Sequence, residues 1–226
     1  MAKLYIVPTP IGNLEDISLR ALRILKESDL ILCEDTRITS KLLSHYEIVK
    51  PTIPYHKFNE HKQLASFIRS IQQHQSVAMV SDAGTPGISD PGFLLIRECI
   101  KENIEIECLP GATAFVPALV NSGLPCDRFY FYGFLPHKKG RQTALKFLST
   151  VKETFVLYES PFRLIKTLEQ LIEVCGSERK VCVSRELTKI YEENIRGSLA
   201  EVTAYFKQKT VKGEIVIIVE GNHQET

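Results

Sequence analysis

Short apolar runs alternate with stretches of helical periodicity through the first half of the chain. Continuous apolar runs of about four residues are typical of strands buried on both faces of a sheet. The predicted strands cover Leu4 to Val7, Leu30 to Cys33, Val77 to Val80 and Ile104 to Leu109. The predicted helices cover Ser18 to Ser28, Thr36 to His45, Gln63 to Gln73, Gly92 to Glu102 and Ala114 to Asn121. This alternation predicts a parallel sheet with helices on both of its faces.

The second half opens with an aromatic strand and continues as a second α/β pattern. Its predicted strands cover Phe129 to Phe134, Thr154 to Tyr158, Lys180 to Ser184, Ile195 to Gly197 and Ile215 to Val219. Its predicted helices cover Gln142 to Val151, Pro161 to Val174 and Leu199 to Gln208. The turn residues Gly123-Leu124-Pro125 separate the halves. We therefore expect an N-terminal domain over 1–123, a C-terminal domain with a mixed sheet over 124–226, and a ligand cleft between them.

The most informative loop follows the strand Val77 to Val80 and reads Ser-Asp-Ala-Gly-Thr-Pro-Gly-Ile-Ser-Asp-Pro-Gly over residues 81–92. Ligands of open α/β sheets bind at the carboxyl ends of strands, where Asp82 would emerge. Glycine and proline turn the backbone tightly and leave its N–H and C=O groups accessible. Asp90 and Pro91 suit the cap and first turn of a helix. Because the loop is longer than an ordinary strand-to-helix connection, a binding loop is favoured over a simple connection.

Polar residues also follow other predicted strands. Glu34, Asp35 and Arg37 come after the second strand, and the Gly-x-Gly-x-x-Gly fingerprint of dinucleotide-binding folds is absent after the first. His56, Asn59 and Glu60 lie in an extended connection over 51–60 and could line a site, although a solvated loop is the alternative.

Composition narrows the class of protein. The chain has 226 residues, a net charge of +1 and no apolar run near the roughly 20 residues of a membrane span. With no signal-peptide pattern at its start, we expect a cytoplasmic protein. Six scattered cysteines without a Cys-x-x-Cys pair argue against a zinc site and, in a reducing compartment, against disulfides. The densest basic cluster is the loop with Lys138, Lys139 and Arg141, either a nucleic-acid contact or a solvated turn.

Several motifs together resemble the tetrapyrrole methylase superfamily. They are Val-Pro-Thr-Pro-Ile-Gly-Asn-Leu from residue 7, Cys-Glu-Asp-Thr-Arg from residue 33, the loop over 81–92, Leu-Pro-Gly-Ala-Thr-Ala from residue 109 and Tyr-Glu-Ser-Pro-Phe-Arg from residue 158. The resemblance covers essentially the whole chain in order. The sequence Val80-Ser81-Asp82-Ala83, where many tetrapyrrole-modifying members have Gly-Gly-Asp-Pro, is similar to the branch that acts on small-subunit ribosomal RNA.

The resemblance implies a homodimer of two-domain subunits that binds S-adenosylmethionine between the domains. It also implies methyl transfer to the ribose 2′-oxygen of a cytidine in the decoding region of the small-subunit RNA, with naked RNA or the assembled 30S particle as substrate. The family's cofactor contacts would fall on Pro10, Ile11, Ser81, Asp82, Thr85, Thr113, Ala114, Tyr158 and Glu159.

The sequence does not single out a general base. Glu34, Asp35 and Glu159, with Arg37 beside them, are candidates at strand ends for the catalytic group. Lys138, Lys139, Arg141, Arg163 and Arg185 are candidates for holding RNA phosphates. Two alternatives stay open, namely methylation of a tetrapyrrole, and a nucleotide-binding, ribosome-associated module without turnover. None of these functions requires a metal.

Overall fold

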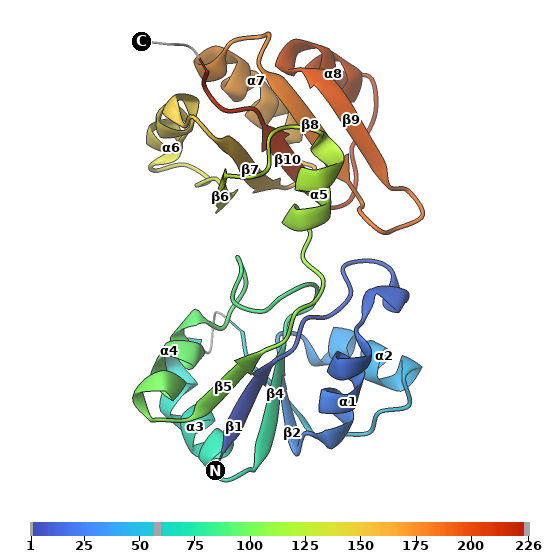
Figure 1. The fold of residues 1–226 in the computed structure, drawn as a ribbon, viewed down its shortest axis with the longest axis vertical. Coiled ribbons are helices and arrows are strands. Elements are labelled where there is room, and N and C mark those ends of the chain that lie inside the picture. Colours follow the sequence, from blue (N-terminus) through green and yellow to red (C-terminus); the bar gives the residue numbers. More distant parts are fainter. Residues whose placement is uncertain (1, 57–59, 224–226) are drawn as a thin grey trace. The chain divides into compact units, whose positions relative to one another are not determined.

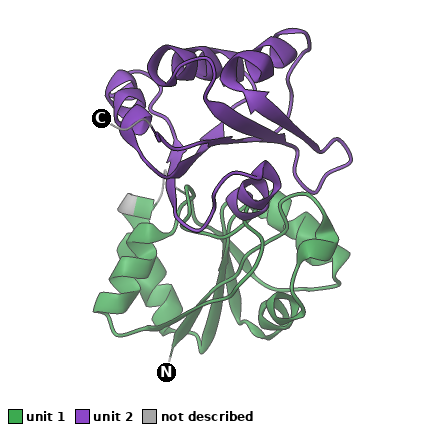
Figure 2. Ribbon diagram, turned by 45° about the horizontal axis from the view of Figure 1, so that its top comes forward, with its two compact units in different colours: residues 1–113 green, residues 114–226 purple. Residues whose placement is uncertain are grey.

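The computed structural model describes residues 2–56 and 60–223 and divides the chain into two compact units, Met1–Thr113 and Ala114–Thr226 (Figures 1 and 2). The first unit contains a five-stranded parallel sheet in the order β3-β2-β4-β1-β5, as expected for the first half. Its strands are β1 (Lys3–Ile6), β2 (Leu30–Cys33), β3 (Thr52–Pro54), β4 (Ser76–Val80) and β5 (Glu105–Cys108).

Two helices cover each face of this sheet (Figure 1). The helices are α1 (Leu19–Glu27), α2 (Thr36–His45), α3 (Glu60–Gln72) and α4 (Phe93–Lys101), and a short 3-10 helix spans Leu14–Asp16. Side chains alternate along each strand, so Ala78 and Val80 of β4 pack with α1 and α2, whereas Val77 and Met79 pack with α3 and α4. The continuous apolar runs therefore reflect burial on both faces.

The second unit contains a mixed sheet in the order β6-β7-β10-β8-β9, which confirms the expected fold class. Only the β6–β7 pair is parallel, and the other three pairs are antiparallel. Its strands are β6 (Phe129–Phe134), β7 (Thr154–Glu159), β8 (Lys180–Arg185), β9 (Glu193–Ser198) and β10 (Ile215–Val219). Its helices are α5 (Phe115–Ser122), α6 (Arg141–Thr150), α7 (Leu164–Cys175) and α8 (Leu199–Lys207).

Helices α6, α7 and α8 pack on one face of this sheet, and α5 contacts strands β8, β9 and β10. The division between the units falls before α5 because this helix packs on the second sheet. The boundary expected after residue 123 would have left α5 with the first half. No helix among the described residues is both long and apolar enough to cross a membrane.

Three expected helix starts are wrong, and the first is that of α3, which begins at Glu60 rather than at Gln63. Helix α4 begins at Phe93. Its N-cap is Gly92, whose φ of 141° is accessible to glycine. No side chain of the preceding loop caps the helix, so Asp90 is not the N-cap. The Glu60 Oε1 atom instead accepts hydrogen bonds from the N–H groups of Gly92 at 3.3 Å and Leu94 at 3.2 Å. Helix α7 begins at Leu164 rather than at Pro161. Tertiary contacts thus decide where these helices start.

Candidate functional site

The loops that follow β1 and β4 define a crevice at the carboxyl edge of the first sheet. These two strands are parallel neighbours, yet the chain leaves β1 toward the face covered by α1 and α2, and leaves β4 toward the face covered by α3 and α4. Adjacent strands whose connections diverge in this way form the switch point at which open α/β sheets bind ligands. The topology therefore places a ligand site beside residues 7–13 and 81–92.

Thr9 and Gly84 join these two loops. Each donates its backbone N–H to the carbonyl of the other at 2.9 Å, and the Thr9 hydroxyl donates to the Ser81 carbonyl at 3.2 Å. Gly84 has a φ of +80°, and a Cβ added there would lie 3.4 Å from Ile11 Cγ2. Ser81 is buried and directs its hydroxyl to the carbonyls of Ala83 and Gly84. The crevice is thus held by backbone pairing in a conformation that favours glycine.

The loop after β5 contacts both the loop after β1 and the loop after β4. Thr85 donates its hydroxyl to the carbonyl of Ala112 at 3.0 Å, so loops 81–92 and 109–113 are tied together. Gly111 lies so close to Pro8 that an added Cβ would meet the proline Cβ at 2.5 Å. Of the expected cofactor contacts, Pro10, Ile11, Ser81, Asp82 and Thr85 come together in the first unit. Thr113 ends that unit, and Ala114 precedes α5 in the second.

Three acidic side chains meet where β2 and β4 end. The Asp82 Oδ1 atom accepts the backbone N–H of Asp35 at 3.0 Å, and the Glu34 Oε2 atom accepts that of Asp82 at 3.4 Å. Asp35 caps α2 and forms an ion pair with Arg37, whose Nη2 atom lies 2.5 Å from Asp35 Oδ2. The neighbouring strands β2 and β4 are parallel, which is why these residues meet although they are far apart in the sequence.

The two aspartates have opposite pKa shifts. Hydrogen bonds from the Arg37 side chain and backbone lower the pKa of Asp35 to about 2. Burial raises the pKa of Asp82, and the nearby charge of Asp35 adds to this effect against the opposing hydrogen bond from the Asp35 N–H. Asp35 is thus bound by its arginine. Asp82 is a partly buried carboxylate, and no arginine among the described residues donates a hydrogen bond to it. A positively charged ligand would stabilise the ionised form of Asp82.

A hollow of about 220 Å³ lies beside Asp82. It is smaller than the roughly 300–1,000 Å³ of typical small-molecule pockets, so it has room for part of a nucleoside-sized ligand. Several of its lining residues, including Thr9, Leu14, Ile38 and Leu42, were not among the expected contacts, because a turn and a helix that are distant in sequence supply them. The lining residues are Thr9, Pro10, Leu14, Ile38, Thr39, Lys41, Leu42, Ser81 and Asp82.

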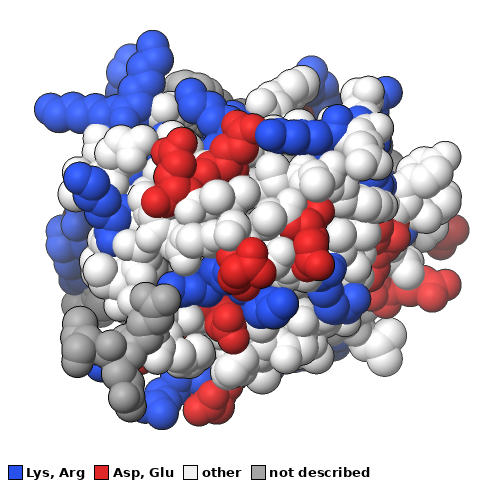
Figure 3. All heavy atoms as spheres, turned by 90° about the horizontal axis from the view of Figure 1, so that it is seen from above, with Lys and Arg blue, Asp and Glu red and all other residues white. Residues whose placement is uncertain are grey.

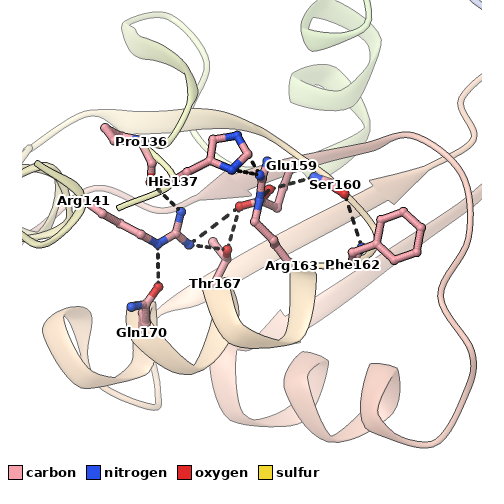
Figure 4. A network of polar contacts seen from close by, with 9 residues as sticks. All are labelled: Pro136, His137, Arg141, Glu159, Ser160, Phe162, Arg163, Thr167 and Gln170. Atoms are coloured by element: carbon pink, nitrogen blue, oxygen red, sulfur yellow. Dashed lines mark hydrogen bonds and ion pairs between the residues drawn. The ribbon is translucent and has the colours of Figure 1, made fainter. Parts of the chain in front are cut away.

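In the second unit, Tyr158 and Glu159 lie on opposite faces of β7. Tyr158 contacts the rings of Phe131 and Phe134, with centroid distances of 5.3 and 5.5 Å. Glu159 is 3% exposed, and its carboxylate accepts hydrogen bonds from Arg163 Nε at 2.8 Å and from the Thr167 hydroxyl at 2.7 Å (Figure 4). Its Oε1 atom also accepts the N–H of Ser160. The geometry of Glu159 is that of a residue that positions α7.

Arg141 departs from its expected place among the exposed cations of the basic loop. It is 6% exposed and donates to Gln170 Oε1 at 2.8 Å, to the Pro136 carbonyl at 3.2 Å and to the Thr167 hydroxyl at 2.6 Å (Figure 4). Its Nη2 atom also lies 3.8 Å from Glu159 Oε2. A guanidinium held in this way is part of the interior, so Lys138 and Lys139 are the exposed cations of the loop.

The two remaining arginines are also engaged. Arg163 contacts Glu159 and the ring of His137. Arg185 pairs with Glu193 at 2.5 Å and donates to the carbonyls of Tyr191 and Lys212. These contacts engage the Nε and Nη1 atoms of Arg163 and all three side-chain nitrogens of Arg185, which leaves less of both guanidinium groups for phosphate.

The switch-point crevice, its glycine-dependent loop and its partly buried carboxylate define a ligand-binding α/β protein. A family model described as Tetrapyrrole (Corrin/Porphyrin) Methylases matches residues 3–203, and the chain belongs to this family.

Three relatives called "Ribosomal RNA small subunit methyltransferase I" are similar over nearly the whole chain. The protein of Synechocystis sp. is 48% identical over 98% of this chain and 80% of its own length. That of Thermotoga maritima is 45% identical over 98% of this chain and 99% of its own length. That of Escherichia coli O157:H7 is 46% identical over 97% of this chain and 78% of its own length.

Solved structures share the fold at lower identity. Uroporphyrin-III C-methyl transferase from Thermus thermophilus, complexed with S-adenyl homocysteine, has a TM-score of 0.67 at 19% identity, and the match covers 96% of each chain. Diphthine synthase has a TM-score of 0.73 at 13% identity, covering 97% of this chain and 90% of the other. These likenesses support the expected two-sheet architecture.

Proposed function

We propose that this protein transfers a methyl group from S-adenosylmethionine to the ribose 2′-oxygen of a cytidine in the decoding region of small-subunit (16S) ribosomal RNA. The observation that carries the proposal is the similarity of 45–48% identity, along nearly the full chain, to relatives called "Ribosomal RNA small subunit methyltransferase I". The modified atom and nucleotide follow from the resemblance of the motifs. Such an enzyme would act in the cytoplasm, on the RNA or on the 30S particle.

The residues of the first unit suit a cationic cofactor. Asp82 lines the hollow, is partly buried and accepts one backbone hydrogen bond, so its charge is available to a sulfonium group. Pro10, Ser81 and Thr9 would fix the orientation of the bound molecule. When bound, S-adenosylmethionine supplies an already activated methyl group. The protein's chief task is then to align the nucleophile and exclude water, which can contribute roughly 7–11 kcal/mol.

Glu34 is the carboxylate we assign to proton transfer from the ribose hydroxyl. Asp35 and Glu159 are each held in an ion pair with an arginine, so other groups of the protein already engage their carboxylate oxygens. The lowered pKa of Asp35 further weakens that residue as a base. Glu34 lies at the same sheet edge as Asp82, whose N–H it accepts at 3.4 Å. We assign Glu159 to positioning Arg163 and α7, and Tyr158, Thr113 and Ala114 remain candidates for contacts with the cofactor.

Mapping of ribose methylation in the small-subunit RNA tests the proposal. Cells lacking this protein should lose one 2′-O-methylated cytidine, and the purified protein with S-adenosylmethionine should restore it on particles or on RNA. Glu34→Gln should lower kcat by about 10²–10⁴ without weakening cofactor binding. An unchanged methylation map in cells without the protein would contradict the proposal.

The family resemblance also leads us to propose a two-fold homodimer, the commonest symmetry of soluble oligomers. Light scattering at micromolar concentration should give twice the mass of the 25.6 kDa chain. A monomer mass throughout that range would count against the dimer.

A further inference from the structure

Positive charge is concentrated in one continuous segment of a nearly neutral chain. Residues 128–152 contain six of the 28 Lys and Arg residues and none of the 27 Asp and Glu residues, so the rest of the chain has 22 bases and 27 acids. The six are Arg128, Lys138, Lys139, Arg141, Lys146 and Lys152. A local excess of this kind attracts a polyanion although the net charge is only +1.

The fold places this segment at the edge of the second sheet. Residues 128–152 comprise β6, the basic loop and α6, and β6 is an edge strand that pairs only with β7. Five of the six cations are exposed, because only Arg141 points inward. Within the described residues no carboxylate forms an ion pair with Lys138, Lys139, Lys146 or Lys152, whereas Arg128 has a long contact of 3.6 Å to Asp127. In the space-filling view, Lys and Arg side chains gather along the left margin, the side on which α6 lies in Figure 1 (Figure 3).

An exposed aromatic pair belongs to the same segment of the chain. Tyr130 of β6 and Phe147 of α6 meet edge to face, with ring centroids 5.5 Å apart, and are 39% and 48% exposed. Neither ring belongs to the buried core of the second unit, which the inward faces of α6, α7 and α8 complete without them. Lys146 precedes Phe147 on α6 and is exposed. Aromatic faces beside flexible cations are the elements with which proteins hold single-stranded nucleic acid.

We propose that Tyr130 and Phe147 form a stacking platform for unpaired bases of the substrate RNA, while Lys138, Lys139 and Lys146 contact its phosphates. The inference rests on the proposed function only for the identity of the RNA. A second copy of the chain fits this surface less well, because an isologous contact would bring unpaired lysines of one copy toward the same lysines of the other.

The chain contains no tryptophan, so a single substitution provides a specific reporter. In Phe147→Trp, a base that stacks on the indole should quench its fluorescence. A single-stranded RNA should therefore quench the emission, whereas an abasic strand of equal length and phosphate number should bind without quenching. Equal quenching by both strands, or none by either, would overturn the proposal.

Leucine variants measure the contribution of stacking. Phe147→Leu and Tyr130→Leu keep apolar volume and remove the aromatic face, so each should weaken RNA binding about fivefold or more at fixed salt. The slope of log affinity against log salt should stay constant, because no phosphate contact is lost. Tyr191→Leu is the matched control, since this ring is 72% exposed at a site outside the segment. Circular dichroism establishes that each variant is folded.

Three outcomes separate the possibilities. Wild-type RNA affinity in both leucine variants would refute the platform, and a shift from dimer to monomer with unchanged RNA affinity would identify the surface as a contact between copies. If the wild-type protein does not methylate ribosomal RNA, the proposed function fails. The comparison of base-containing and abasic strands still decides whether bases stack on this surface.

Discussion

The Asp82 carboxylate accepts the backbone N–H of Asp35 at 3.0 Å, which ties the end of β4 to the end of β2. This single hydrogen bond leaves the charge of Asp82 available at the hollow, while Asp35 is neutralised by Arg37. Two adjacent aspartates thus have different tasks because their surroundings differ.

Asp82→Asn should weaken binding of S-adenosylmethionine by about 1.5–3 kcal/mol, since a charged acceptor is replaced by a neutral one. The amide oxygen can still accept the Asp35 N–H, so the fold should persist. Because burial raises the pKa of Asp82 in the folded protein, its ionisation costs stability as pH rises through that pKa. The variant should therefore be at least as stable as wild type at pH 7. Calorimetric titration measures the affinity. Equal affinities of the variant and the wild type would show that the cofactor does not bind beside Asp82.

Asp35→Asn should make the protein less stable than the wild type at neutral pH, and this difference in stability should disappear in acid. The folded pKa of Asp35 is about 2, below its ordinary value near 3.9 in unfolded chains. The stabilisation is therefore present above about pH 4 and is lost as pH falls through the folded pKa. Asparagine is also a good N-cap, so the comparison isolates the charge. Urea unfolding from pH 7 to about pH 2 should show the two stability curves converging, and parallel curves would contradict the prediction.

Glu60→Ala should destabilise the first unit by about 2–3 kcal/mol. The buried Glu60 Oε1 atom accepts hydrogen bonds from the Tyr55 hydroxyl at 2.5 Å and from the N–H groups of Gly92 and Leu94. Truncation to alanine leaves these three donors without their acceptor. Glu60→Gln keeps an acceptor and should lose less. Hydrogen exchange at the start of α4 should accelerate in the alanine variant. Protection equal to wild type would show that the cap does not hold this helix.

Arg141→Ala should destabilise the second unit by about 2–3 kcal/mol, because Gln170, Thr167 and the Pro136 carbonyl lose the guanidinium to which they bond. Lys138→Ala, three residues earlier on an exposed turn, should change stability by less than about 0.5 kcal/mol. Chemical denaturation of both variants measures the contrast. If Arg141→Ala unfolds like wild type, the guanidinium is not part of the interior.

The double substitution of Lys138 and Lys139 by Ala should reduce the slope of log RNA affinity against log salt by about 1.4–1.8, at roughly 0.7–0.9 per lost phosphate contact. Cofactor affinity should be unchanged. Substituting Lys26 and Lys101 by Ala, at the ends of α1 and α4, removes the same charge from outside the basic segment. Equal slopes in the two double variants would show that the loop is only a solvated turn.

Local patterns were sufficient to predict most of the secondary structure. Apolar runs and helical periodicity indicated β1, β2 and β4 within a residue or so, because burial on both faces requires continuous hydrophobic strands. The short strand β3 was missed, since it has only three residues, with Pro51 just before it and Pro54 as its last residue. The loop after β4 was predicted at the carboxyl end of its strand, where open α/β sheets bind ligands, and the family resemblance implied cofactor contacts on this loop and on the loop after β1.

What the sequence by itself determined is therefore the type of most elements, the parallel and mixed sheets, and the loop that carries Asp82. Only the tertiary structure decided which charged side chains are available. Arg141 and Lys139 are two residues apart in one basic loop, yet α7 encloses the first and leaves the second exposed. Glu60 caps a helix that begins more than thirty residues later. Such assignments depend on contacts between distant segments, and the free energy of burying a charge is set by those contacts rather than by sequence neighbours.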